Sequence, residues 1–218
     1  MESGTARRTQ AERSAATRIR LLDATVDCLA TYGYAGTTTP RVAELAGLTR
    51  GAQIHHFPSK EDLVVAAIEH LAQQRVHAAI RELGRVQTGR DFLSTMLDFM
   101  WEAHQGPTFV ATMELWVAAR TDPVLARQIE RVEPVVNSTL VAAIAQLVPS
   151  SSSGSARIDP RQIRNVLFTA MDVLRGILVS SFVDQDPQRA RRRWDRACVD
   201  LRRIWPRASS SAASTEER

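Results

Sequence analysis

Two side chains able to read base pairs stand three positions apart in a short segment, residues 50–56, that the sequence predicts to be helical. Arg50 carries a guanidinium that can donate two hydrogen bonds to guanine, and Gln53 carries an amide that can pair with adenine. Near the start of a helix both side chains fall on one face, which can enter a major groove. We therefore predict that Arg50 and Gln53 contact base edges.

A second group of polar side chains suits contacts with phosphate. Helix amino termini offer free N–H groups and positive partial charge to anions. Lys60, the only lysine among 28 lysine and arginine residues, lies at one such terminus. Which of the adjacent histidines faces DNA stays open, because neighbours point to different sides of a helix. The predicted phosphate contacts are Thr38, Thr49, His55, His56 and Lys60.

The surrounding sequence predicts a helix-turn-helix that holds these residues. Gly47 suits a left-handed turn, and Thr38 and Thr49 each precede a short helical segment as a cap. Pro58 ends the second segment because proline does not fit a helix interior. The predicted helices of this part cover about residues 14–33, 39–46, 50–56 and 59–83.

Five stretches, taken in this order and spacing, resemble the TetR family of transcriptional regulators over about residues 15–65. They are Ile19 to Ala24, Tyr32-Gly33-Tyr34, Thr37-Thr38, Val42 to Ala52 and His56 to Leu63. The resemblance implies an N-terminal DNA-binding domain followed by helices that bind a ligand and form a dimer. Ile54 departs from the family, because a tyrosine often stands there and contacts the DNA backbone.

The whole chain is predicted to be all-α, with about nine helices and no strand. Prolines near proposed helix starts divide the second half into helices at about 91–104, 107–120, 122–148, 160–184 and 187–205. Residues 150–155 resemble a flexible linker. The expected parts are a disordered basic arm at 1–13, the three-helix DNA-binding domain at 14–60, a larger helical regulatory and dimerisation domain at 61–206, and a disordered tail at 207–218.

Composition favours a globular protein, since 44% of the residues are hydrophobic. No apolar run is long enough to cross a bilayer, and residues 1–10 lack the apolar core of a signal peptide. Cys28 and Cys198 fit buried free thiols in a reducing compartment. We therefore expect a cytoplasmic, nucleoid-associated protein without a membrane partner. The net charge of +4 is mild support for a polyanionic partner.

The sequence predicts neither an enzyme nor a metal or cofactor site. The serines at 151–153 have no histidine or aspartate arranged beside them, and no glycine-rich phosphate loop is present. His55 and His56 have no third ligand at a suitable spacing. The arginines at 191–193 fit a solvated helix face better than a second nucleic-acid patch.

The resemblance also implies a small-molecule pocket and a two-fold interface in the C-terminal helices. Aromatic and methionine side chains there suit either a pocket wall or a solid core. The predicted pocket residues are Leu97, Trp101, His104, Phe109, Met113, Trp116, Phe168, Met171 and Arg175. The predicted interface residues are Leu167, Leu174, Leu178, Trp194, Cys198, Leu201 and Trp205.

These observations predict a homodimeric repressor that binds a palindromic site in double-stranded DNA and is released by a small, partly apolar effector. A symmetric dimer suits a palindrome because its paired helices must meet successive major grooves. Two alternatives stay open. One is a ligand-independent activator or architectural DNA-binding dimer, and the other is a helical enzyme or scaffold with an incidental helix-turn-helix.

Overall fold

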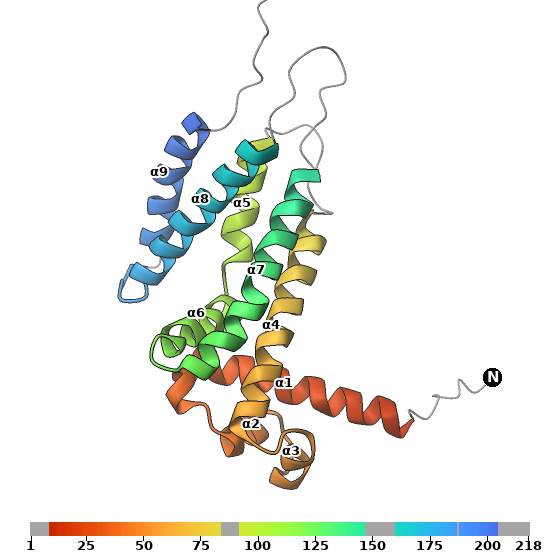
Figure 1. The fold of residues 1–218 in the computed structure, drawn as a ribbon. Coiled ribbons are helices and arrows are strands. Elements are labelled where there is room, and N and C mark those ends of the chain that lie inside the picture. The colour runs from red at the N-terminus through yellow and green to blue at the C-terminus, as the bar shows by residue number, and fades with distance from the viewer. Residues whose placement is uncertain (1–8, 84–91, 147–159, 187, 205–218) are drawn as a thin grey trace, which may run out of the picture. The chain divides into compact units, whose positions relative to one another are not determined.

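The computed structural model describes residues 9–83, 92–146, 160–186 and 188–204. Within these residues the chain forms nine α-helices and no strand, which confirms the all-α prediction. None of the described helices combines the length and apolar character needed to cross a bilayer. The helices, shown in Figure 1, are α1 (Gln10–Gly36), α2 (Thr39–Leu45), α3 (Arg50–His56), α4 (Lys60–Leu83), α5 (Phe92–Ala103), α6 (Pro107–Ala119), α7 (Pro123–Gln146), α8 (Pro160–Ser180) and α9 (Arg189–Ile204).

The start of α1 differs from the prediction, because residues 10–13 are helical and not part of an arm. Thr9 and Glu12 form a capping box. The Thr9 hydroxyl accepts from the Glu12 N–H at 3.2 Å, and the Glu12 carboxylate accepts from the Thr9 N–H at 2.7 Å. The rest of the predicted arm, the predicted linker and the predicted tail lie outside the described residues.

Gly33 interrupts α1 near its end. Its φ of 68° and ψ of 177° fall in a region that is almost closed to residues with a Cβ. A Cβ at this position would lie 2.9 Å from Glu114 Oε2. Thr37 secures the turn, since its N–H and its hydroxyl donate to the Gly33 carbonyl at 3.1 and 2.8 Å. The helix was predicted to end at this glycine. In the structure Gly33 interrupts α1, which continues to Gly36.

Packing divides the chain into two units whose boundaries fall inside α4 and α7. The first unit contains residues 1–75 and 105–135, and the second contains residues 76–104 and 136–218. The helix-turn-helix therefore packs in one unit with α6 and with the first parts of α4 and α7. A boundary at residue 60, expected for a separate DNA-binding domain, is not where the contacts divide.

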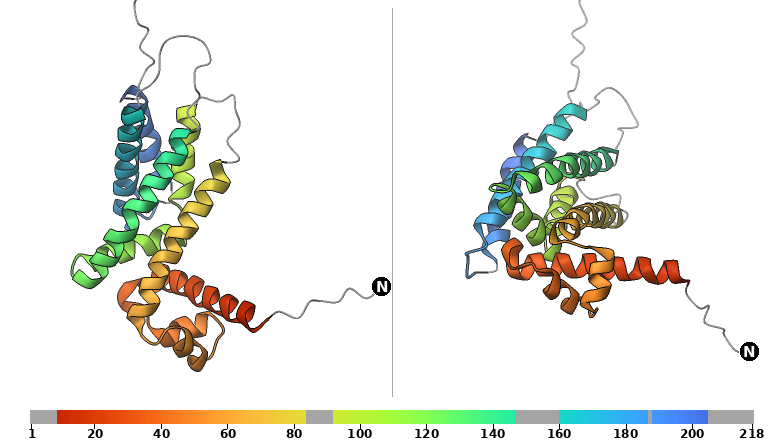
Figure 2. Two further views of the ribbon diagram at one scale, coloured as in Figure 1. Left: turned by 45° about the vertical axis from the view of Figure 1, so that its right-hand side comes forward. Right: turned by 60° about the horizontal axis from the view of Figure 1, so that its bottom comes forward.

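Two faces of α1 are buried in the first unit. On one of them pack α2, which lies beside α1 (Figure 2), and Phe57, the residue that follows α3. The core on this face contains Leu21, Leu22, Ala24, Cys28, Val42, Ala46, Phe57, Leu63, Ala66 and Ala67. The core on the other face contains Val26, Leu29, Val64, Ile68, Leu71, Ala111, Leu115 and Leu125. Because α1 and α4 contribute to both cores, they connect the helix-turn-helix to α6 and α7.

In the second unit, α8 contacts both α5 and α9. The buried face of α9 consists of Trp194, Cys198 and Leu201, which recur at helical spacing. Arg191 donates to Asp98 on α5 at 2.9 Å. Both cysteines of the chain are buried and free, as predicted. Burial raises the pKa of the Cys198 thiol to about 11.

Gly33→Ala tests the break in α1. We expect the free energy of unfolding to fall by about 2 kcal/mol or more, because alanine disfavours this backbone conformation and its Cβ meets Glu114. Gly51→Ala is the matched control, since Gly51 is helical and a Cβ there has only Thr49 Oγ1 nearby, at 3.9 Å. Its stability should rise slightly. Urea unfolding followed by circular dichroism measures both, and equal effects would contradict this account.

Candidate nucleic-acid interface

Gly47 makes the turn between α2 and α3. Its φ is 61°, a left-handed conformation that glycine adopts without steric cost. Its N–H donates to the Glu44 carbonyl at 2.9 Å, which closes the end of α2. Thr49 then caps α3, because its hydroxyl accepts from the Ala52 N–H at 3.2 Å. The turn predicted from the glycine and threonine is confirmed.

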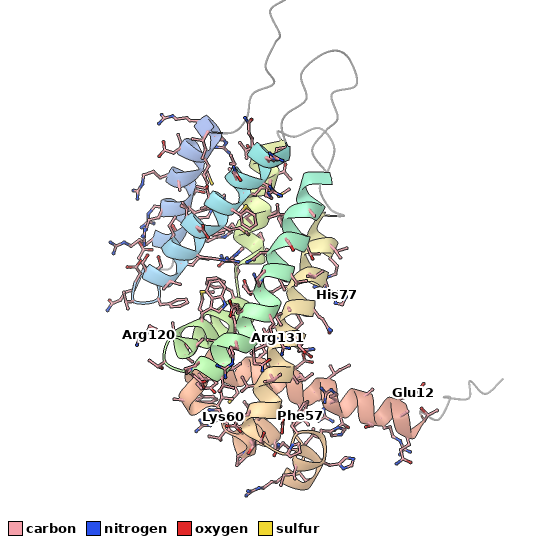
Figure 3. The ribbon with its side chains drawn as sticks, viewed as in Figure 1. Glu12, Phe57, Lys60, His77, Arg120 and Arg131 are labelled. Carbon is pink, nitrogen blue, oxygen red and sulfur yellow. The ribbon has the colours of Figure 1, made fainter. Side chains whose placement is uncertain are left out.

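Packing against α1 holds both short helices in place. Val42 and Ala46 of α2 share one core with Phe57, which ends α3 and is labelled in Figure 3. The Arg18 guanidinium lies 4.5 Å from the centre of the Phe57 ring. Arg20 donates from Nη2 to the Ala46 carbonyl at 2.5 Å. One helix therefore supports both sides of the turn.

These arginines have a structural role that sequence reasoning missed. Nothing in the sequence around Arg18 and Arg20 indicates this role. Arg41 also acts inside the fold, since it donates to the Gly36 carbonyl and lies 4.4 Å over the Tyr32 ring. Arg20 and the carbonyl of Ala46 that it contacts are 26 residues apart, so no local sequence pattern indicates this hydrogen bond. No signal in one sequence distinguishes such a residue from a solvated arginine.

The two predicted base readers have opposite environments. Arg50 is exposed at the first position of α3. Gln53 is only 1% exposed, and its side-chain amide donates to the Phe57 carbonyl at 2.5 Å. Its other amide atom, Oε1, is buried without a hydrogen-bond partner. The prediction that Gln53 shares an outward face with Arg50 is therefore wrong for this structure, because position 53 faces the core.

The outer face of α3 includes a residue that the sequence prediction passed over. Ile54 is 46% exposed and follows Arg50 by one helical turn. The sequence singled it out only because a tyrosine often stands at this position in the family that the chain resembles. An exposed apolar side chain beside an arginine suits contact with a thymine methyl group. The sequence held one signal for this role: Ile54 is an apolar residue at a position that does not face the core.

The predicted phosphate residues surround this face. Thr38 and Thr49 are exposed caps. His55 is exposed, whereas His56 is partly buried, and the two rings meet edge to face at 5.4 Å. Burial first, then the charges of His55 and Arg18, lowers the pKa of His56. His55 is thus the more accessible of the two histidines.

Lys60, the fifth predicted phosphate residue, already has partners. Its ammonium donates to the Tyr34 carbonyl at 2.8 Å and lies 4.2 Å from the centre of the Tyr34 ring. The side chain is partly buried at the start of α4 (Figure 3). The lone lysine is therefore held against the end of α1.

A small cavity that opens to solvent lies in the first unit among α4, α6 and α7, and its volume of about 20 Å³ holds about one water molecule. Arg75 and Glu133 form a two-pronged ion pair in its wall, with Arg75 Nη1 donating to both carboxylate oxygens at 2.8 and 3.0 Å. The remaining wall is mostly apolar. It consists of Ile68, Leu71, Ala72, Thr112, Leu115, Trp116, Ile129 and Val132.

The predicted pocket residues are divided between the two units, so that pocket stays a prediction. Trp116 lines the observed cavity, and Phe109 and Met113 are buried on the same helix. Arg175 donates to Asn137 at 3.0 Å within the second unit. The second unit also holds Leu97, Trp101, His104, Phe168 and Met171.

The predicted interface residues are already buried within one chain, at no more than 8% exposure. They are Leu167, Leu174, Leu178, Trp194, Cys198 and Leu201, while Trp205 lies outside the described residues. These residues are buried within the chain, where α8 packs on α9 and α5. The prediction that they form a subunit interface is therefore corrected. The exposed apolar residues on α8, α9 and the turn between them include Val173, Val179, Phe182, Val183, Val199 and Ile204.

Comparisons with known proteins agree with this geometry. Residues 21–67 match the family described as bacterial regulatory proteins, tetR family. The HTH-type transcriptional regulator CymR of Pseudomonas putida is 34% identical over 85% of this chain and 89% of its own length. The HTH-type transcriptional repressor AcnR of Corynebacterium jeikeium is 28% identical over 75% of this chain and 92% of its own length.

Solved structures show the same fold. The multidrug binding protein EbrR complexed with ethidium superimposes with a TM-score of 0.56, covering 88% of this chain and 99% of that one at 21% identity. A putative TetR-family regulator from Mesorhizobium loti gives a TM-score of 0.66, covering 88% and 96% of the two chains at 16% identity.

Gln53→Ala and Arg50→Ala should separate a core residue from a surface residue. We expect Gln53→Ala to lower the free energy of unfolding by about 1–2 kcal/mol, because it removes buried volume and the hydrogen bond to Phe57. Arg50→Ala should change it by less than about 0.5 kcal/mol. Urea unfolding gives both values. An unchanged stability for Gln53→Ala would show that the amide is not held in the core.

Proposed function

Because the chain belongs to the TetR family of bacterial transcriptional regulators, we propose that it acts as a homodimeric repressor of a palindromic operator, released by a small effector. AcnR, the relative described above, is named a repressor. The observation that carries the proposal is Arg50, exposed at the first position of α3, whose C-terminal cap Phe57 packs in the core beside α1 and under Arg18.

In the proposed complex, α3 enters the major groove and Arg50 pairs with a guanine. Ile54, one turn further along α3, contacts a thymine methyl group. Gln53 stays in the core and keeps α3 in place. Its orphaned Oε1 costs some stability, which the surrounding packing offsets.

Phosphate contacts fix the register of α3 without adding sequence information. We assign them to Thr38 and Thr49, the exposed caps of α2 and α3, and to His55, which is exposed in the last turn of α3. A threonine hydroxyl can accept from the backbone as a cap and still donate its own hydrogen to a phosphate oxygen. His56 is the second choice because it is partly buried.

The cavity among α4, α6 and α7 supports the effector hypothesis. Its wall combines aliphatic side chains and Trp116 with one ion pair, which matches the chemistry of a small and partly apolar molecule. The cavity holds about one water molecule in this structure, so it must widen when an effector binds. EbrR, which shares this fold, is complexed with ethidium. An effector releases DNA only if it binds the DNA-free state more tightly than the DNA-bound state.

The proposed dimer uses the outer face of α8. Val173, Gly176 and Val179 share that face, opposite the buried stripe of the same helix. Small and β-branched residues allow two helices to approach closely around a two-fold axis. A palindromic operator then matches the symmetry of the protein.

Arg50→Ala tests DNA reading. Operator fragments are first selected from genomic DNA with the wild-type protein, and affinity is measured by fluorescence anisotropy. We expect the variant to lose about 10- to 100-fold in affinity and to relax preference at one G·C pair in each half-site. Arg131→Ala, an exposed arginine on α7, serves as the control and should bind as wild type. Unchanged affinity for Arg50→Ala would exclude the proposed base contact.

Ala72→Leu tests the effector site. The isopropyl group that leucine adds fills the cavity, so the variant should still bind the operator while losing its response to effector. Candidate compounds come from a thermal-shift screen of wild-type protein, followed by an operator-release assay. A compound that releases wild type and Ala72→Leu at the same concentration does not use this cavity.

A further inference from the structure

Pro134 stands in the middle of α7, a place that proline rarely occupies in a helix. The helix runs from Pro123 to Gln146, and Pro134 lies inside it. Proline has no N–H, so the carbonyl of Glu130, one turn earlier, receives no helical hydrogen bond from residue 134. Glu130 is exposed, and water can donate to that carbonyl instead. The hydrogen bonding of α7 is therefore interrupted at one level, on a side that water reaches.

The interrupted level of α7 lies beside the cavity. The α7 residues that line the cavity are Ile129, Val132 and Glu133, and the last of these directly precedes Pro134. Pro134 itself is exposed. Around the helix axis it lies about 160° from Val132 and about 140° from Ile129. The proline is thus on the outer face of α7, opposite the apolar side chains that line the cavity.

The position of the proline sets the direction in which α7 bends most easily. A helix opens on the side of its proline, and that side becomes convex. In α7 this side is exposed, so further bending moves the middle of the helix towards solvent and away from the cavity. Leu125 and Val141 are buried, in the first and second unit respectively, and hold the two ends. With ends held about 14 and 10 Å from the proline, an extra bend of about 20° shifts the middle by about 2 Å.

The helix on the other side of the cavity is continuous, and it holds α7 through an ion pair. From Lys60 to Leu83, α4 contains neither proline nor glycine. Its Arg75 donates to both carboxylate oxygens of Glu133, the residue next to the proline. Both side chains are mostly buried, so salt screens the pair less than at an open surface. Outward bending of α7 carries Glu133 away from Arg75, and the ion pair therefore opposes it.

We propose that Pro134 is a hinge at which α7 bends outward to widen the cavity, and that the ion pair of Arg75 and Glu133 favours the closed state. The closed state is the one in this structure, in which the cavity holds about one water molecule. The inference rests on the proposed effector site, because it concerns how that site opens.

Hydrogen exchange of the free protein tests the hinge. Pro134→Ala restores an N–H that donates to the Glu130 carbonyl, so the amides of residues 135–138, in the turn after it, should open less often. We expect their exchange, corrected for intrinsic rates, to slow by about 10-fold. Amides of α9 serve as the reference for any change in global stability. Equal exchange of residues 135–138 in wild type and Pro134→Ala would overturn the hinge.

Pro123→Ala is the matched control for this experiment. It makes the same chemical change in the same helix, but Pro123 is the first residue of α7, where an N–H has no helical partner. The exchange of residues 135–138 should therefore stay as in wild type. Slower exchange there in Pro123→Ala as well would show that the effect does not arise at residue 134, and would contradict the proposal.

Benzene tests whether the same bend widens the cavity. It is uncharged, suits the apolar wall and is larger than the one water molecule that the closed cavity holds. Trp116 lines the cavity, so protein labelled with 5-fluorotryptophan reports entry by fluorine NMR, with the resonance assigned by Trp116→Phe. Benzene should shift this resonance in wild type, and bind about 5-fold more weakly to Pro134→Ala and unchanged to Pro123→Ala. No shift in wild type, or equal affinity for wild type and Pro134→Ala, would contradict the widening.

Glu133→Gln tests the ion pair. Glutamine keeps the size of the side chain and removes its charge, so the open state should become more populated. We expect benzene to bind about 5-fold more tightly and residues 135–138 to exchange faster. Glu130→Gln, on the exposed side of the same helix, is the matched control and should behave as wild type. Unchanged or weaker benzene binding by Glu133→Gln would show that the ion pair does not hold the cavity closed.

These experiments use neither operator nor effector, so they separate the hinge from the proposed function. A wild-type protein that binds no selected operator overturns the proposed function, while a hinge measured in this way still stands. Exchange and benzene binding that do not respond to Pro134→Ala overturn the hinge, even in a protein that binds its operator and is released by an effector.

Discussion

Burial of α1 on two faces determines what the rest of the first unit can do. One face carries α2 and α3, and the other packs on α6 and α7, with α4 contributing to both cores. Each leucine, isoleucine, valine or phenylalanine side chain in these cores contributes about 1.5–3 kcal/mol when fully buried. Neither face can be uncovered without losing several such contacts. The helix-turn-helix and the cavity helices are for this reason parts of one packed body, and α1 and α4 are its shared elements.

Local signals in the sequence were sufficient for the helices and the turn. Glycine with positive φ, proline at helix starts and threonine caps act over a few residues, so Gly47, Thr49 and Pro123 could be interpreted without the fold. Gln53 was misjudged because its residue type suits adenine, while its place one turn before Phe57 faces the core. A seven-residue helix has few inward positions, and the packing decides which they are.

The errors in the second half of the chain have a related cause. An apolar stripe on α9 can pair with another helix of the same chain or with a second subunit, and the sequence does not distinguish these partners. Trp194 and Leu201 are buried within the chain. The ion pair of Arg75 and Glu133, 58 residues apart, was equally invisible. Arg18, Arg20 and Arg41 make contacts inside the fold. The net charge of the chain therefore overstates the number of positive side chains that are free to contact DNA.

The buried thiol of Cys198 limits the kinds of stimulus to which the second unit can respond. With a pKa near 11, only about one thiol in ten thousand is ionised at neutral pH. The thiolate is the form that attacks peroxides, disulfides and electrophilic metabolites. We therefore expect oxidants and alkylating agents to modify this thiol far more slowly than an exposed, acidic cysteine.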